Sequence, residues 1–249
     1  MKRPSILRAM AEPVRASGEY ATSIGLLPFR RLLPHGDGQP VLVLPGFGAS
    51  DRSSGTIRRL LDSLGYQSHP WGLGRNMGPT QRVINELPSL LDRIAGETGR
   101  TVSLIGWSLG GIYARQLAAR DPESVRSLVT LGTPVRSEVQ TASNAAPLYN
   151  ALQAFHVPAR PLLDDGEPLD VPVTAVHTRS DGIVHWETCL VQEAPRTENL
   201  RVRGSHTGLG YNPAVAYIVA DRLALPEATW EPFQVPAQYR RIISVASTS

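Results

Sequence analysis

Short apolar runs alternate along the chain with longer segments in which apolar residues recur at helical spacing. The runs are VLVL (41–44), VSLIG (102–106), VRSLVTLGTP (125–134), VPVTAVHT (171–178) and NLRVRG (199–204). VLVL is a continuous apolar run, which is typical of a strand buried on both faces of a parallel sheet. We therefore predict a strand in each run, and a weaker additional strand in YQSHPWGL (66–73).

Helical segments separate these strands. We predict helices over 53–65, 80–99, 108–120 and 211–225, and a short one over 184–193. In the second of these, apolar residues form one stripe, and Pro88 should either kink the helix or mark its start. Strands that alternate with helices predict an α/β fold, with βαβ units in one open, mostly parallel sheet and helices on both of its faces.

We divide the chain into a lead-in segment (1–39), a main domain (40–225) with an insertion at about 135–170, and a C-terminal tail (226–249). The lead-in carries apolar residues at helical spacing, namely Ile6, Leu7, Met10 and Val14. This stripe could meet a lipid surface, a partner chain or the protein's own core. The lead-in makes a poor signal peptide and no apolar run is long enough to cross a membrane, so we expect a cytoplasmic protein.

Charge and cysteine content exclude several classes. Lys and Arg number 25 against 22 Asp and Glu, and the basic residues are spread along the chain, which does not favour nucleic-acid binding. Cys189 is the single cysteine, so no intrachain disulfide or cysteine-based metal cluster can form. The glycine-rich WGLGRNMG (71–78) lacks a P-loop lysine.

One serine is set among glycines where a predicted strand meets a predicted helix, in GWSLGG. A sharp strand-to-helix turn there would expose the hydroxyl of Ser108 at the carboxyl end of the sheet, where functional groups gather. Gly106 and Gly110 would let the helix approach the neighbouring strands without Cβ clashes. The pattern alone also fits an ordinary turn, but its position favours a nucleophile.

A serine nucleophile needs a base, and the base needs an orienting acid. Of the six histidines, His206 alone lies after the last predicted strand and late in the chain, whereas His177 falls inside a predicted strand and is interpreted as a core or face residue. Asp181 directly follows the strand at 171–178, while Asp164, Asp165 and Asp170 precede that strand. Position therefore favours His206 as base and Asp181 as acid.

The order Ser108, Asp181, His206 resembles that of the α/β-hydrolase family of serine esterases and lipases, over roughly Val41 to Leu225. The resemblance implies that LPGFGAS forms the oxyanion loop, with the backbone N–H groups of Phe47 and Leu109 as donors. It also implies a reduced sheet of about six strands, since 1–39 shows no hairpin, and a cap or lid at 135–170.

The substrate pocket is the least specified part. We interpret WGLGRNMG (71–78) as a loop at the rim of the active site, where Arg75 or Asn76 could contact substrate. We expect Trp107, beside the nucleophile, and the stripe of Leu148, Leu152 and Phe155 in the insertion to contact the acyl group; the same stripe would also suit a helix packed on the body. We predict a serine carboxylic-ester hydrolase for short- to medium-chain acyl esters, with no metal and no cofactor. The alternatives are a thioesterase or acyltransferase with the same triad, or a non-catalytic binding module on a hydrolase scaffold.

Overall fold

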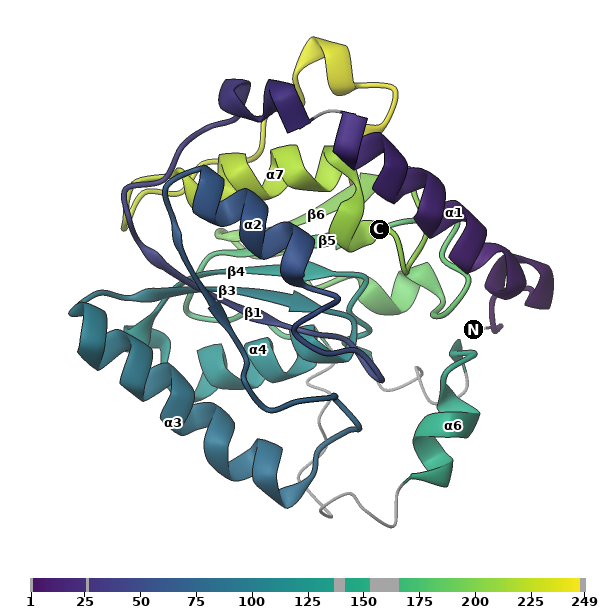
Figure 1. The fold of residues 1–249 in the computed structure, drawn as a ribbon, viewed down its shortest axis with the longest axis horizontal. Helices are drawn as coiled ribbons and strands as arrows, with labels where there is room; N and C mark the ends of the chain where they lie inside the picture. Colours follow the sequence, from purple (N-terminus) through teal and green to yellow (C-terminus); the bar gives the residue numbers. More distant parts are fainter. Residues whose placement is uncertain (1, 26, 137–141, 153–165, 247–249) are drawn as a thin grey trace.

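A single seven-stranded sheet organises the chain (Figure 1). The computed structural model describes residues 2–25, 27–136, 142–152 and 166–246. In spatial order the strands are β2 (Gln67–Pro70), β1 (Pro40–Leu44), β3 (Val102–Trp107), β4 (Val125–Leu131), β5 (Val173–His177), β6 (Thr197–Val202) and β7 (Ile243–Ala246). All neighbouring strands run parallel except β6 and β7. The α/β fold and each predicted strand are confirmed.

The sheet has seven strands where about six were predicted, and the seventh lies in the segment that we set apart as a C-terminal tail (226–249). β7 lies in that tail and pairs antiparallel with β6, with Leu200 opposite Val245. The tail is also held by Glu198 of β6, whose carboxylate accepts a hydrogen bond of 2.9 Å from the N–H of Phe233. β7 is four residues long and mostly not buried, so it lacks the continuous apolar signal of the central strands.

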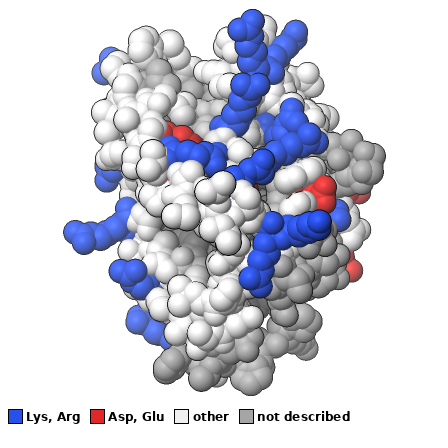
Figure 2. All heavy atoms as spheres, turned by 90° about the vertical axis from the view of Figure 1, so that its right-hand side faces the viewer, with Lys and Arg blue, Asp and Glu red and all other residues white. Residues whose placement is uncertain are grey.

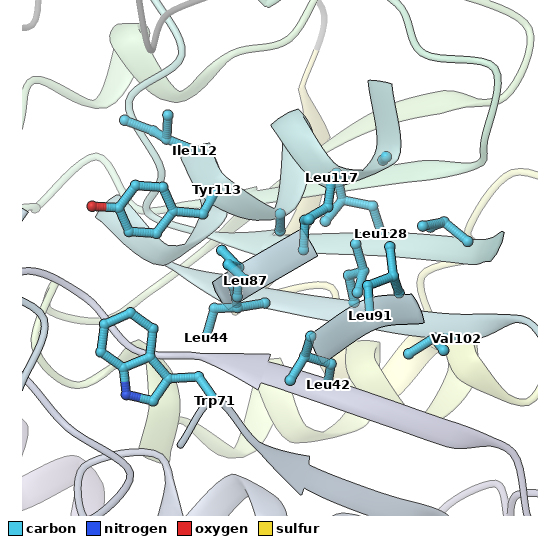
Figure 3. Packing of buried hydrophobic residues seen from close by; sticks show 14 of the residues in the cluster. Leu42, Leu44, Trp71, Leu87, Leu91, Val102, Ile112, Tyr113, Leu117 and Leu128 are labelled. Carbon is cyan, nitrogen blue, oxygen red and sulfur yellow. The ribbon is translucent and has the colours of Figure 1, made fainter. Parts of the chain in front are cut away.

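Helices cover both faces of the sheet, as predicted. On one face lie α2 (Gly55–Ser63) and α7 (Pro213–Leu223), and on the other lie α3 (Gln81–Thr98) and α4 (Leu109–Arg120). Figure 3 shows Leu87 and Leu91 of α3 lying over Leu42 and Leu44 of β1. Each face thus buries its own apolar cluster against the strands, which makes the sheet a rigid support for the loops at its edge.

Local signals set the ends of α3. The hydroxyl of Thr80 accepts a hydrogen bond from the N–H of Val83, and Gly99 ends the helix in the left-handed conformation with φ of 63°. Pro88 lies in the interior of the helix, so it does not mark the start. In place of the helix expected at 184–193 the structure has a short 3-10 helix, η4 (Trp186–Cys189). Further 3-10 helices are η2 (Pro122–Ser124), η5 (Leu209–Tyr211) and η6 (Ala237–Tyr239).

The lead-in segment forms a long helix, α1 (Ile6–Gly25), followed by the 3-10 helix η1 (Leu27–Leu32). α1 lies along the upper right of Figure 1, next to η5 and α7. In the insertion, α6 (Ala146–Ala151) is the helix that the structure describes. No helix within the described residues is both long enough and apolar enough to cross a membrane.

Candidate active site

Ser108 occupies a strained turn between β3 and α4. Its backbone angles are φ 51° and ψ −121°, which a residue with a Cβ rarely adopts. The turn is close-packed, because a Cβ on Gly106 would lie 2.2 Å from the Cα of Gly111, and one on Gly110 would lie 2.3 Å from the carbonyl oxygen of Leu44. The two glycines therefore let α4 begin directly against β1 and β3.

Asp181 and His206 form a buried pair at the same edge of the sheet. The Nδ1 atom of His206 lies 2.6 Å from Oδ2 of Asp181. The other carboxylate oxygen, Oδ1, accepts hydrogen bonds from the N–H groups of Ile183 (2.7 Å) and Val184 (2.8 Å). Both oxygens of Asp181 are thus occupied, which fixes the carboxylate plane and directs Nε2 of the imidazole away from it.

The loop of His206 lies against the turn of Ser108. The indole N–H of Trp107 donates a hydrogen bond of 3.1 Å to the carbonyl oxygen of His206. Gly132, directly after β4, also packs against the imidazole of His206, since a Cβ at Gly132 would lie 3.0 Å from Nδ1. The hydroxyl of Ser108 itself makes no hydrogen bond to any residue that the structure describes. Catalytic contacts of this kind often tighten only when substrate binds.

Two opposing effects act on the imidazole of His206. Burial lowers its pKa, but the carboxylates of Asp181 and Glu12 raise it, and together they hold the pKa of His206 above its ordinary value. A raised pKa makes the imidazole a stronger base once it is neutral. It also stabilises the imidazolium that forms when the ring takes a proton.

The predicted oxyanion loop approaches Ser108 closely. A Cβ on Gly46 would lie 3.2 Å from Cβ of Ser108, which is tighter than most Cβ contacts, so a larger residue here would push the two segments apart by a few tenths of an ångström. The backbone N–H groups of Phe47 and Leu109 donate no hydrogen bond within the described part of the chain. Leu109 is also the first residue of α4, where N–H groups are free of helical partners. Both groups are therefore available to an oxyanion.

Comparison with known proteins agrees with the fold described above. The family model described as the alpha/beta hydrolase fold matches residues 39–155. This chain has the α/β-hydrolase fold. Among solved structures, the monoacylglycerol lipase of Paleococcus ferrophilus aligns with a TM-score of 0.56 at 16% identity, over 77% of this chain and 96% of that one. Aspergillus fumigatus lipase B aligns with a TM-score of 0.58 at 14% identity, over 78% and 55%.

Curated relatives are named esterases and lipases. A pimeloyl-[acyl-carrier protein] methyl ester esterase of Shewanella woodyi is 33% identical over 98 residues, which are 39% of this chain and 37% of the relative. A triacylglycerol lipase of Pseudarthrobacter phenanthrenivorans is 33% identical over 107 residues, 39% and 33% of the two chains. The matched part of the chain thus spans little more than a third of these relatives.

The position of Asn76 differs from the one that the sequence suggested. We predicted a rim residue that could contact substrate, but Asn76 is fully buried. Its side-chain amide donates a hydrogen bond of 2.8 Å to the carbonyl oxygen of Pro45, and its backbone carbonyl accepts one of 2.6 Å from Gly48. Arg75 donates to the carbonyl oxygen of Gly48 from outside. Both residues therefore hold the predicted oxyanion loop in place.

Glu12 was not predicted to contribute to the site. It lies in α1 and is 2% exposed. Its Oε1 atom accepts hydrogen bonds from the N–H groups of Gly182 (2.8 Å) and His206 (3.1 Å), and its Oε2 atom from Thr207 (2.8 Å). These N–H groups belong to the loops that carry the acid and the base. Glu12 therefore fixes the two loops relative to each other.

Arg15 and Glu19 extend this contact along α1. Arg15 donates to the carbonyl oxygens of Ser180 (2.7 Å) and Gly204, and Glu19 accepts two bonds of 2.7 Å from the N–H and hydroxyl of Ser205. The signal was present in the sequence, because Glu12, Arg15 and Glu19 recur at helical spacing opposite the apolar stripe. The sequence does not indicate whether the polar or the apolar face of α1 is buried.

The predicted substrate-binding residues are placed unevenly. Trp107 is buried, and its indole N–H donates a hydrogen bond to the backbone of His206. Leu148 of α6 is 61% exposed, whereas its neighbour Tyr149 packs edge-on against Phe47 at 5.5 Å between ring centroids. Leu152 follows α6 and is partly buried, and Phe155 lies outside the described residues. Within α6, Tyr149 therefore packs on the predicted oxyanion loop, whereas Leu148, which we expected to contact the acyl group, is exposed.

His177, which we did not choose as the base, lies in the core. It lies fully buried in β5, stacked on Trp186 with 5.6 Å between ring centroids. Burial, with smaller contributions from Arg201 and Arg179, lowers the pKa of His177 to about 4. His177 is therefore a core residue rather than a face residue.

Proposed function

We propose that this chain is a serine carboxylic-ester hydrolase that acts through an acyl-enzyme on short- to medium-chain acyl esters. The observation that carries the proposal is the buried pair of His206 and Asp181, 2.6 Å apart, at the sheet edge where Ser108 occupies its strained turn. Such a pair supplies a base with a fixed tautomer next to a serine hydroxyl. The relatives named above act, by their names, on methyl esters and triacylglycerols, and both groups are carboxylic esters.

In the first step, Oγ of Ser108 attacks the ester carbonyl carbon and its proton passes to Nε2 of His206. The carbonyl oxygen becomes an oxyanion and takes hydrogen bonds from the N–H groups of Phe47 and Leu109. The bond to the alcohol oxygen then breaks, and His206 returns the proton to that oxygen. The products are the free alcohol and an acyl group bound to Ser108.

In the second step, water repeats this route. His206 takes a proton from water as its oxygen attacks the acyl carbon, and the same N–H groups hold the second oxyanion. Collapse of this intermediate releases the carboxylic acid and returns the proton to Ser108. Throughout both steps Asp181 remains a carboxylate that accepts the bond from Nδ1–H and stabilises the imidazolium.

The insertion between β4 and β5 supports a preference for acyl chains of short to medium length. Residues 135–170 are a modest addition to the α/β body, and α6 brings Tyr149 against Phe47. An aromatic pair over the oxyanion loop favours a pocket of medium depth rather than an open cleft for long triglycerides.

The test is hydrolysis of p-nitrophenyl esters from acetate to palmitate by the wild-type protein and by Ser108→Ala. We expect turnover with the best rate at short to medium chains, and a loss of several orders of magnitude in Ser108→Ala. Ser89→Ala, an exposed serine of α3, is the matched control and should keep full activity. A fluorophosphonate probe should label wild type and Ser89→Ala but not Ser108→Ala.

Turnover that survives in Ser108→Ala would overturn the assignment of the nucleophile. Labelling of Ser108 without ester turnover at any chain length would instead favour a thioesterase or acyltransferase with the same residues. Absence of both labelling and turnover would favour a binding module on the hydrolase scaffold.

A further inference from the structure

α1 has its polar face buried and its apolar face exposed, the reverse of an ordinary surface helix. Glu12, Arg15 and Glu19 face the loops of the candidate active site. On the opposite side, large apolar side chains are exposed to solvent: Ile6, Leu7 (79%), Met10 (72%), Val14 (76%) and Ile24. A contiguous exposed apolar stripe of this kind marks an interaction surface.

The stripe continues beyond the end of α1. In η1, Phe29 and Leu32 are also exposed, at 59% and 80%. A cavity of about 320 Å³ opens between the end of α1, η1, α2 and α7. Its lining is largely apolar and includes Ile24, Phe29 and Leu60, with Arg30 and Arg59 among the polar residues. The apolar surface therefore runs from the start of α1 into a hollow beside η1.

The charges around this surface are almost all basic. Lys2 and Arg3 precede α1, and Arg30 and Arg31 lie in η1 beside its exposed apolar side chains. The two acidic residues of the segment, Glu12 and Glu19, are directed at the body of the protein. Figure 2, which views the side of the molecule where α1 begins, shows many Lys and Arg side chains and few Asp or Glu.

An apolar stripe flanked by basic residues fits the boundary between the headgroups and acyl chains of an anionic bilayer, where both kinds of side chain are stabilised. We propose that α1 and η1 form a docking surface for an anionic phospholipid bilayer. The apolar side chains of α1 enter the interface, and the basic residues at its two ends contact lipid phosphates. A protein partner would satisfy the apolar stripe equally well, but the basic residues at both ends favour the lipid.

This docking would bring the candidate active site to the lipid surface. The same helix that meets the bilayer contacts the loops of Asp181 and His206 through Glu12. The edge of the sheet that carries Ser108 would therefore lie next to the interface. Binding itself needs no catalysis, so it is measured equally well with the Ser108→Ala protein.

The experiment is co-sedimentation with large vesicles of phosphatidylcholine alone or of an equal mixture with phosphatidylglycerol. We expect wild type and Ser108→Ala to bind the mixed vesicles far better, and binding to weaken as salt is raised. Met10→Ser/Val14→Ser should lower the affinity about tenfold or more, since two exposed apolar side chains are removed. Val245→Ser, an exposed valine of β7, is the matched control and should bind like wild type.

The charge contribution is tested separately. Arg30→Gln/Arg31→Gln should lower the affinity for mixed vesicles about tenfold. Arg82→Gln/Arg93→Gln changes the net charge equally on α3, on the opposite side of the sheet, and should have little effect. Unchanged thermal unfolding shows that each variant is folded.

Failure of wild type to bind mixed vesicles, or equal binding by Met10→Ser/Val14→Ser, would overturn the proposal. So would a dimer in light scattering that Met10→Ser/Val14→Ser converts to a monomer while vesicles stay unbound. In that case the stripe would cover a second copy of the chain.

Discussion

The carboxylate of Glu12 accepts a hydrogen bond of 3.1 Å from the backbone N–H of His206, although the two residues lie 194 positions apart. The same oxygen accepts a bond from Gly182, directly after Asp181. A helix from the start of the chain thus holds the loops of both the proposed base and its proposed orienting acid. Glu12 is a positioning residue, and its negative charge also acts on the imidazole.

We expect Glu12→Gln to move the acidic limb of the pH–rate profile to lower pH. The base must be neutral to act, so activity rises as pH rises through the pKa of His206. The Glu12 carboxylate helps to raise that pKa, and removing the charge lowers it. The amide group of glutamine also leaves one of the N–H donors without an acceptor, which should lower the free energy of unfolding by about 1–3 kcal/mol. The pH dependence of kcat/KM and urea unfolding measure the two effects.

Glu86→Gln on the exposed face of α3 is the control for this change, since Glu86 forms an exposed surface ion pair with Arg82. It should leave both the pH profile and the stability near wild type. A Glu12→Gln protein that loses stability but keeps the wild-type pH profile would limit Glu12 to a structural role.

Asp181→Asn should lower kcat by about 10³- to 10⁴-fold with little change in stability or KM. Since Oδ1 of Asp181 accepts two backbone N–H groups, the amide oxygen of asparagine would take that position. Its NH₂ group would then face Nδ1 of His206 and leave the proton on Nε2, which points it at Ser108. That tautomer cannot accept the serine proton.

Asp170→Asn is the control for Asp181→Asn, because Asp170 precedes β5 and is exposed. It should retain full turnover in the p-nitrophenyl ester assay. If Asp181→Asn stayed within tenfold of wild type, another carboxylate would have to orient His206.

Central strands and the candidate triad were predictable because their signals are local. Most strands of the core are rich in Val, Leu and Ile, and Ser108, Asp181 and His206 lie in the connections just after β3, β5 and β6. Parallel strands bring their carboxyl ends to one edge, so chain order alone placed these residues together. β7 was missed because its neighbour on the sheet, β6, is about forty positions away and its own pattern is weak.

The roles of Glu12 and Asn76 could not be predicted for a different reason. Each acts through hydrogen bonds to backbone groups of distant loops, and backbone groups have no sequence pattern. Polar residues on a helix or in a glycine-rich loop are also usually solvated. Only the folded arrangement distinguishes a buried, fully bonded polar side chain from an exposed one.

Asn76→Asp should lower kcat by up to about 10²-fold, because the carboxylate cannot donate to the carbonyl oxygen of Pro45 and would repel it. Movement of this loop would displace the N–H of Phe47, and losing one oxyanion donor costs about 10²–10³ in kcat. KM should change less than kcat if the effect lies on the transition state. Steady-state kinetics on the preferred p-nitrophenyl ester measure the split.

Asn85→Asp, on the exposed face of α3, makes the same chemical change away from the site and should leave kcat unaltered. Equal losses of activity in both variants would mean that added negative charge, rather than the contact with Pro45, is responsible.

The strain at Ser108 should be measurable as stability. In Ser108→Ala the Cβ remains at φ 51° and ψ −121°, whereas Ser108→Gly relieves it. We expect the glycine variant to unfold with a free energy about 1 kcal/mol higher than the alanine variant, because relief of backbone strain exceeds the extra entropy of the glycine chain. At Ser89, inside α3, the same two substitutions should rank in the opposite order by about 1 kcal/mol. Urea unfolding of the four proteins measures both differences. If glycine were the less stable residue at position 108 as well, the turn would store no strain, and its geometry would have to be maintained by packing alone.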